Sequence, residues 1–390
     1  VRIVAYGERR HGPTGEVEKV LGKLGDPGVD ILSVLYGHGL VPDFPHSVEA
    51  EAEELTDRWE QMLPAELAGG REDHRELWVF TIDPADAKDH DDALSVEPLE
   101  GGRHRVGIHI ADVSYFVRPG SALDDEALHR GTSVYLVDRV IPMLPHALSS
   151  DACSLREKED RLAVSLFATL DEAGSLLETR FARTLIRSRH RLAYEQAQAI
   201  LDGDLSVDRE TDAAVRTLGA LSGRLREARE ARGALDLDLP EARVILDREG
   251  APVEIRRVER LEAHRLVENF MLLANECVAK ACASRKLPAL YRVHEPPTQE
   301  KMTALRDLLQ TFGLRLPKGK VAPGDLERIL DHVRDRPEEQ LVSTVVLRSL
   351  QKAVYSPENL GHFGLALEHY AHFTSPIRRY PDLVTHRVLI

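Results

Sequence analysis

The stretch VFTIDPADAKDHDDALSV, residues 79–96, runs from an apolar, β-prone segment into five aspartates and back into apolar residues. Carboxylates this dense repel one another unless solvent or a cation neutralises them. One interpretation is a solvated acidic loop. The strand-like residues on both sides instead place the acids at a strand end beside a core, which favours a site for Mg2+ or Mn2+, because hard cations prefer carboxylate oxygens. Four of the aspartates could converge there after a turn in the chain: Asp83, Asp89, Asp91 and Asp92.

Length and composition indicate a globular protein. The chain has 390 residues, of which 43% are hydrophobic and 30% charged, enough for one large core and a small accessory domain. No apolar run reaches the roughly 20 residues of a membrane-spanning helix. The three cysteines form no zinc or disulfide pattern, so we expect a reducing, cytoplasmic compartment. The opening VRIVAY and the last residues, within a helical pattern, suggest a piece of a longer protein.

The charge balance argues against a non-specific coat on nucleic acid. There are 51 basic and 65 acidic residues, a net charge of −14. The balance does not exclude an enzyme with a local basic track, and arginines do cluster within residues 180–191 and 256–265. A solvated strand or helix face is the alternative interpretation of both clusters. No heptad or large apolar stripe suggests assembly, so we expect a monomer.

The pattern of apolar residues predicts an α+β protein with an N-terminal β-barrel remnant. Residues 1–45 alternate in short apolar runs between turns, which predicts an all-β unit with one strand near 29–35. An acidic amphipathic helix is expected over 47–68, and Gly69-Gly70 form a boundary. Beyond it we expect strands at 77–82, 92–97, 104–113, 162–170 and 177–187, a hairpin at 242–259, and helices at 209–232, 260–284, 300–313 and within 324–354.

A second candidate site is HFTSPIRRYPD, residues 372–382. Thr374 or Ser375 followed by Pro376 is a helix-start signal, and a helix N-terminus with Arg378 and Arg379 in its first turn would bind an anion. The alternative is a capped surface helix whose arginines face water. Together with the aspartates the segment favours phosphodiester hydrolysis, which needs carboxylates for a metal and a cation on the phosphate.

Other candidates lie on predicted helices and aliphatic stretches. Glu268 belongs to a partly polar stripe of the 260–284 helix, where it could act as a general base, orient water, or simply face solvent. Tyr135 and Tyr194 stand among aliphatic residues, where an aromatic usually packs in a core but can also stack on bases.

Several long motifs in order resemble one family. With the aspartate segment, they are similar to the catalytic domain of the ribonuclease II/ribonuclease R (RNB) family over residues 71–390, and closest to its ribonuclease R branch. Residues 1–45 resemble the cold-shock OB-fold domain that precedes it. We therefore expect a partial OB-fold with a connecting helix at 1–68, and at 71–390 an RNB domain of mixed sheets, surrounding helices and a central RNA channel, with its C-terminal end missing. The motifs are GIHIADVSYFV (107–117), IPMLPHALSSDACSL (141–155), RLAYEQA (191–197), RLVENFMLLAN (265–275) and HFGLALEHYAHFTSPIRRYPD (362–382).

The resemblance implies a processive, Mg2+-dependent 3′-to-5′ exoribonuclease that hydrolyses single-stranded RNA to nucleoside 5′-monophosphates. From the carboxylates we expect Mn2+ as a substitute metal, and from the apolar runs no membrane partner. The resemblance also implies that the four aspartates hold metal, Asp83 and Asp92 most closely, with Asp91 also catalytic. Arg378 would stabilise the phosphate at cleavage, with Arg379 beside it on the RNA, and Glu268 would meet the terminal nucleotide. Tyr194 would position that nucleotide and Tyr135 would clamp bases. Leu237 stands where the family often has an aromatic clamp, so π stacking is lost there.

Two rival functions belong to other classes. Degenerate members of the family bind RNA without cutting it, but here all four aspartates and Arg378 are present. A metal-dependent DNA nuclease is compatible with the aspartates alone.

Overall fold

The computed structural model describes residues 1–7, 12–23, 25–26, 28–236, 241–247 and 250–390. They divide into two compact units. The smaller comprises Val1–Phe44, Val134–Ile141 and Ala242–Val258, and the larger comprises Pro45–Ser133, Pro142–Glu241 and Glu259–Ile390. Leu237, the expected clamp position, lies outside the described residues.

The described residues of the smaller unit form a helix and three two-stranded sheets, of which the first two named here are antiparallel. The strands are β1 (Arg2–Ala5) with β2 (Thr14–Glu16), β7 (Val134–Tyr135) with β8 (Val140–Ile141), and β11 (Glu241–Leu246) with β12 (Pro252–Val258). The strand expected near 29–35 is wrong, because Val29–Gly37 forms the helix α1. Gly28, at φ 78°, starts that helix, and buried Leu35 follows half-buried Ile31 and Leu32 at helical spacing. The strand was predicted from alternate residues, Val29, Ile31, Ser33 and Leu35, a pattern that does not include the half-buried Leu32.

The larger unit is built on a six-stranded sheet in the order β3-β10-β4-β5-β6-β9. The long strand β10 closes this sheet on itself, because residues 176–187 pair antiparallel with β9 whereas residues 188–193 pair parallel with β4. Most strand predictions are confirmed, but β10 continues past the expected end at 187. The strands are β3 (Glu72–Asp73), β4 (Val79–Asp83), β5 (Asp92–Pro98), β6 (His104–Ala111), β9 (Asp160–Leu170) and β10 (Leu176–Ala193).

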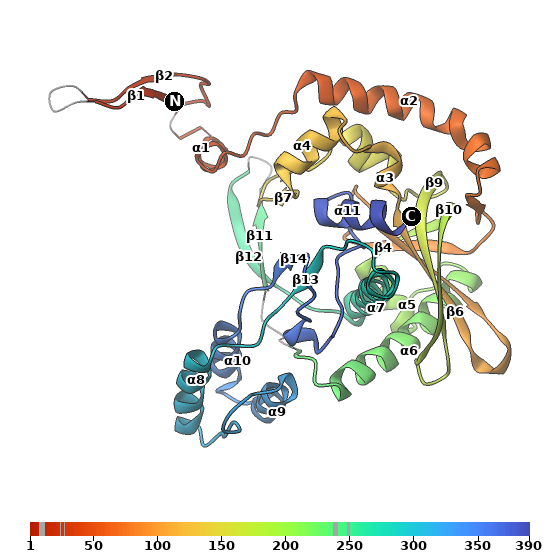
Figure 1. The fold of residues 1–390 in the computed structure, drawn as a ribbon, viewed down its shortest axis with the longest axis vertical. Helices are drawn as coiled ribbons and strands as arrows, with labels where there is room; N and C mark the ends of the chain where they lie inside the picture. The colour runs from red at the N-terminus through yellow and green to blue at the C-terminus, as the bar shows by residue number, and fades with distance from the viewer. Residues whose placement is uncertain (8–11, 24, 27, 237–240, 248–249) are drawn as a thin grey trace. The chain divides into compact units, whose positions relative to one another are not determined.

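Three helices cover the sheet and form the main core with it (Figure 1). They are α5 (Tyr194–Asp202), α6 (Arg209–Ala231) and α7 (Glu262–Arg285). Phe80 and Ile108 from the sheet and Phe270 from α7 are completely buried in that core. The predicted helices at 209–232 and 260–284 are thereby confirmed, and the apolar face of α7 fixes which of its side chains point away from the core.

The remaining elements of the larger unit include a second apolar cluster. It is formed mainly by α8 (Gln299–Thr311), α9 (Pro323–Val333) and α10 (Glu339–Ser349). Among the described residues, no helix combines the length and apolarity that a membrane crossing requires. The other elements are α2 (His46–Ala68), which confirms the expected acidic helix, α3 (Val113–Phe116), α4 (Ala122–Arg130), β13 (Tyr291–Val293), β14 (Val354–Ser356) and α11 (Tyr380–Leu389).

A buried ion pair ties the sheet to the chain that enters it. The guanidinium of Arg71 donates to Asp112 at 2.8 Å and to the carbonyl of Thr184 at 3.2 Å, and both side chains of the pair are 1% exposed. Burial by itself would raise the pKa of Asp112, but the charge of Arg71 and hydrogen bonds from Ser114 and Arg71 outweigh it and lower that pKa. The carboxylate is therefore ionised in the folded protein.

We predict that Asp112→Ala destabilises the fold by about 3–5 kcal/mol, because it removes the buried partner of Arg71 and leaves that charge only Glu66, a carboxylate 3.2 Å away that is 26% exposed. The measurement is the free energy of unfolding by urea titration. The exposed pair of Arg105 and Glu97, 3.8 Å apart, provides the control, and Glu97→Ala is expected to change stability by less than about 1 kcal/mol. Equal losses in the two variants would contradict a structural role for the buried pair.

Candidate active site

The aspartate segment connects two adjacent antiparallel strands. Asp83 is the last residue of β4 and Asp92 the first of β5, and the pairing of Phe80 with Leu94 brings both strand ends to the same edge of the sheet. Asp91 is 5% exposed, and its main-chain carbonyl accepts from Ala111 on β6 at 2.8 Å. The strand-end placement inferred from the sequence is confirmed, in place of a solvated loop.

Strand β10 brings Tyr194 to the same edge. Ala193 pairs with Asp83, so Tyr194 is the next residue along the chain and begins α5. Its ring stacks on His264 of α7, with the ring centres 4.0 Å apart. Burial raises the pKa of the Tyr194 hydroxyl, and the nearby charges of Asp92 and Asp83 raise it further, so this group stays protonated beside the carboxylates.

The TSPIRR segment does not start a helix, which corrects the sequence interpretation. Helix α11 begins at Tyr380 with Pro381 in its first turn, and residues 376–378 form a turn before it. Asp382 decides this arrangement, because its Oδ1 accepts from the main-chain N–H of Ser375 at 2.8 Å and from Arg379 at 2.7 Å. The predicted anion site at a helix N-terminus is therefore absent from the described segment.

The turn instead joins the aspartates directly. The main-chain N–H of Ile377 donates to Asp91 Oδ1 at 2.8 Å, and the Nε of Arg378 lies 3.8 Å from Asp91 Oδ2. A hydrogen bond of 3.0 Å from Arg378 to the Ser375 hydroxyl holds the guanidinium. Arg378 is 42% exposed at its side chain, so it retains N–H groups for a ligand next to the carboxylates.

Burial dominates the electrostatics of the cluster, and the charge of Arg378 offsets only part of its effect. Burial raises the pKa of Asp91 well above its usual range, although Arg378 and the Ile377 N–H oppose the rise. Burial and the charge of Asp83 raise the pKa of Asp92 to about 8, with Arg378 opposing. Loss of hydration in the buried site is the largest cause for both groups, and repulsion between neighbouring carboxylates adds to it, so a bound cation would lower both pKa values.

The donor chemistry fits a hard divalent cation. Asp83 Oδ2 lies 2.8 Å from His90 Nδ1, but neither buried atom makes a well-formed hydrogen bond within the described part of the chain. Carboxylate oxygens left in this state are the preferred ligands of Mg2+, which often takes only one or two of them directly. As the side chains stand, no set of three His, Cys, Asp or Glu residues in the described ranges has a geometry ready for a metal ion.

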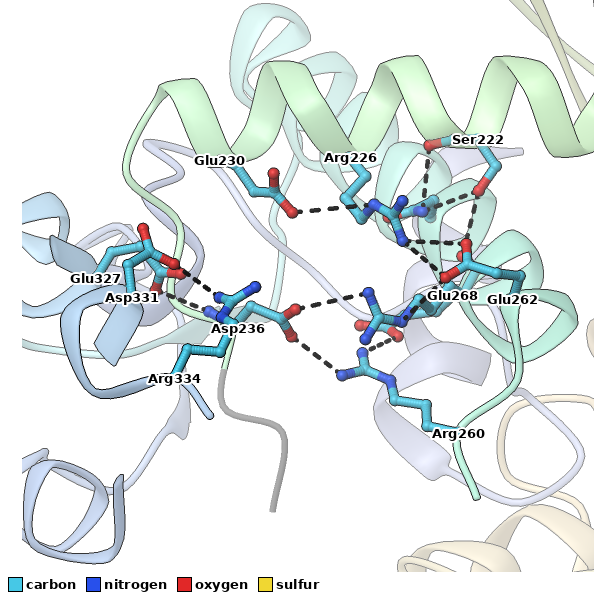
Figure 2. A network of polar contacts seen from close by, with 12 residues as sticks. Ser222, Arg226, Glu230, Asp236, Arg260, Glu262, Glu268, Glu327, Asp331 and Arg334 are labelled. Carbon is cyan, nitrogen blue, oxygen red and sulfur yellow. Dashed lines mark hydrogen bonds and ion pairs between the residues drawn. The ribbon is translucent and has the colours of Figure 1, made fainter. Parts of the chain in front are cut away.

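Glu268 belongs to a neighbouring polar network rather than to the aspartate cluster (Figure 2). It lies one helical turn after His264 on α7, and its Oε2 accepts from Arg260 at 2.5 Å. Arg260 also donates to Asp236 at 3.0 Å. The main-chain N–H of Asp236 in turn donates to Glu327 of α9 at 3.0 Å. The stack of Tyr194 on His264 is the link between this network and the aspartates.

The other predicted site residues have different surroundings. Asp89 is half-buried in the connection between β4 and β5. Arg379 is 19% exposed and donates through Nη2 to Asp382, a carboxylate with no exposure. Tyr135 is 52% exposed on β7 in the smaller unit.

Two participants were missed by the sequence analysis: His90 and the N–H of Ile377. The position of His90 inside the aspartate run was a usable signal. The main-chain donor of Ile377 had none, because any residue type supplies one.

The comparisons with known proteins agree with this geometry. Residues 71–390 match the family model described as RNB domain, and residues 1–45 match the one described as Cold shock domain. Ribonuclease R of Thermotoga maritima is 44% identical over 99% of this chain and 55% of its own length. Ribonuclease R of Escherichia coli is 41% identical over 100% of this chain and 48% of its own length. The chain thus spans about half the length of the curated relatives it matches.

Solved structures give the same result. Mycoplasma genitalium RNase R in complex with double-stranded RNA superimposes with a TM-score of 0.93 at 30% identity, over 99% of this chain and 69% of the other. The complex of the same enzyme with ribose-methylated single-stranded RNA superimposes with a TM-score of 0.90 at 30% identity. The match covers 97% of this chain and 58% of the other. Yeast Ssd1, a pseudonuclease, superimposes with a TM-score of 0.76 at 20% identity, over 99% of this chain and 48% of the other. At this identity the likeness is one of fold alone.

Glu327 generates a pH prediction. Burial raises its pKa to about 7; the Asp236 N–H opposes this, and the charges of Asp331 and Asp236 add to it. Because the folded protein keeps this proton where the unfolded chain loses it, stability should fall as pH rises from about 4.5 to about 7. Glu327→Gln keeps an acceptor for Asp236 but cannot ionise. We expect the free energy of unfolding of Glu327→Gln, relative to that of wild type, to be higher at about pH 8 than at about pH 5 by on the order of 2 kcal/mol.

Urea unfolding at the two pH values measures this difference. Glu97→Gln, at an exposed carboxylate that is not among the charges acting on Glu327, is the control and should show a smaller pH-dependent change. A stability difference between Glu327→Gln and wild type that is the same at both pH values would show that Glu327 is ionised throughout.

Proposed function

Because this chain belongs to the RNB family, whose domain it matches over residues 71–390, we propose that it takes part in 3′-to-5′ hydrolysis of single-stranded RNA. The proposed reaction is processive, depends on Mg2+ and releases nucleoside 5′-monophosphates. The observation that carries the proposal is the convergence of Asp83, Asp91 and Asp92 with Arg378 at one edge of the sheet. The proposed domains are a partial cold-shock OB-fold with its connecting helix at 1–68 and the RNB domain at 71–390.

In this proposal the scissile phosphate lies between the carboxylates and Arg378. Asp83 and Asp92 would hold Mg2+ most closely, with Asp89 and Asp91 orienting water or a second ion. When bound, the metal supplies Lewis acidity and lowers the pKa of water. Arg378 adds charge-assisted hydrogen bonds to the phosphate as negative charge develops on it. The bond from the Ile377 N–H to Asp91 keeps this arginine next to the carboxylates before RNA arrives.

Positioning of the RNA end is assigned to residues around Tyr194. Its stack on His264 fixes the ring at the edge of the aspartate cluster. Glu268, one turn further along the same helix, is proposed to accept a hydrogen bond from the terminal nucleotide. Tyr135 and Leu237 are proposed to contact bases, and Arg379 to support the backbone of the RNA near Arg378. The structures of a relative with single-stranded and double-stranded RNA support RNA as the ligand class.

The rival proposals differ in the ligand or the chemistry. A non-catalytic RNA-binding protein would need no metal set, whereas the four aspartates and Arg378 are all retained here. A DNA nuclease would cut matched DNA and RNA oligonucleotides at equal rates. A time course on 5′-labelled RNA with and without Mg2+ tests the proposal. A descending ladder from the 3′ end supports it, whereas a single internal cut excludes exonuclease action.

We predict that Asp91→Asn abolishes turnover and leaves RNA binding within about twofold, because the amide oxygen still accepts from Ile377 while the charge is lost. Product gels and fluorescence anisotropy measure the two quantities. Asp86→Asn, at an exposed position in the same connection, is the control and should retain activity. Equal loss of binding and turnover in Asp91→Asn would identify the cluster as structural.

The two tyrosines are predicted to fail in different ways. Tyr194→Ala should lower the rate on the order of 100-fold, since a displacement of the scissile phosphate by about 1 Å has that effect. Tyr135→Ala should weaken binding by roughly 1–3 kcal/mol and lengthen the shortest end product, because it removes a stacking surface. Single-turnover kinetics and end-product sizing separate the two. Identical defects in both variants would refute the separate assignments.

A further inference from the structure

One arginine links two carboxylates that belong to different parts of the larger unit (Figure 2). The guanidinium of Arg260 donates through Nη1 to Asp236 Oδ1 at 3.0 Å and through Nη2 to Glu268 Oε2 at 2.5 Å. Asp236 and Glu268 carry the same charge and would repel each other without it. The planar fork of a guanidinium can bond two acceptors at once, which the single ammonium of a lysine does with far less directional control.

The main chain at the Asp236 end of this bridge is anchored independently of α7, although the Asp236 carboxylate also lies 3.8 Å from Arg265 of that helix. The main-chain N–H of Asp236 donates to Glu327, and that of Leu235 donates to the carbonyl of Gly364 at 2.9 Å. Gly233, at φ 88°, packs so closely on Gly324 that an added Cβ would lie 2.9 Å from its backbone. The segment 233–236 is therefore a fixed reference, and Arg260 transfers its position to the side chain of Glu268.

The Glu268 end is the one that needs such support. Its side chain is 40% exposed on α7, so without a partner it would sample several rotamers. Within the described residues, Arg260 donates to the Oε2 atom of Glu268 and not to its Oε1 atom. The Oε1 atom therefore remains as an acceptor for a donor on a ligand. Fixing a carboxylate before the ligand arrives reduces the entropy lost on binding.

Helix stability does not account for Arg260. The residue lies just before the N-terminus of α7, where the helix dipole disfavours a cation. Partly exposed ion pairs also add little to global stability. The bridge is thus better explained by what it does to Glu268 than by what it does to the fold.

We propose that Arg260 is a positioning residue for the end of the RNA: by bridging Asp236 and Glu268 it sets the orientation in which Glu268 meets the terminal nucleotide. The proposal rests on the proposed function. It implies that the bridge matters most for short RNAs, which have few other contacts to hold them, and much less for long ones.

The test compares Arg260→Gln with Arg226→Gln. Arg226 is a matched control, because it belongs to the same network, is 26% exposed against 28% for Arg260, and donates to Glu262 at 3.0 and 3.1 Å without contacting Asp236 or Glu268. Kd for a short and a long RNA is measured by anisotropy without Mg2+, and KM and kcat with Mg2+. Thermal unfolding of each variant checks the fold.

We expect Arg260→Gln to raise Kd and KM for the short RNA by at least about tenfold, the size of one lost charge-assisted hydrogen bond, with kcat on the long RNA within about twofold. Arg226→Gln should match wild type. Arg260→Lys should recover part of the loss, since it restores the charge but not the fork. Asp236→Asn should reproduce the defect, and the double variant should be no worse than either single one.

Several results would overturn the inference. One is equal behaviour of Arg260→Gln and Arg226→Gln. Another is a loss of RNA affinity in Arg260→Gln that is the same for both RNAs and accompanies a fall in thermal stability, which would make the bridge structural. Arg260→Lys, which keeps the charge, then separates an effect on folding from an effect on positioning. Failure of the wild type to bind or shorten any RNA would instead refute the proposed function, so the two failures are distinguishable.

Discussion

The burial of neighbouring carboxylates is the constraint around which this structure is arranged. Asp83, Asp91 and Asp92 lie at the end of β4 and the start of β5. Burial raises the pKa values of Asp91 and Asp92 above their usual range. The protein offsets part of this cost with a main-chain N–H from Ile377 and the charge of Arg378. Both come from a turn almost 300 residues away in the chain, so the site exists only in the folded state.

The closed sheet makes that arrangement possible. Because β10 changes partners along its length, its last residue lies beside the last residue of β4. Tyr194 follows at once and stacks on α7, the helix that also carries Glu268. One strand therefore sets the distance between the carboxylates and the helix proposed to meet the RNA end. A change in the register of β10 would displace both together.

The arginines of the larger unit divide into two kinds by burial. Arg71 and Arg379 are bonded to carboxylates with almost no exposure, so their charges hold segments of the fold together. Arg378 and Arg260 are 42% and 28% exposed and keep N–H groups that a ligand can reach. Neighbouring arginines in the same motif thus differ in exposure and in their bonds within the fold, as Arg378 and Arg379 do, and residue type alone does not distinguish them.

Local periodicity in the sequence was sufficient for most of the sheet, for α2, α6 and α7, and for the strand-end position of the aspartates. These features follow from nearest neighbours along the chain. The helix at 29–37 could have been read from the sequence, because Ile31, Leu32 and Leu35 already stand at helical spacing. The tertiary structure alone decided that α11 starts at Tyr380 rather than near Pro376, and that Arg260 joins Asp236 to Glu268. The physical reason is that these outcomes depend on contacts between residues that are not neighbours in the chain: Asp382 accepts from Ser375 in the TSPIRR turn, and a main-chain N–H of any residue can serve Asp91 once the fold brings it there.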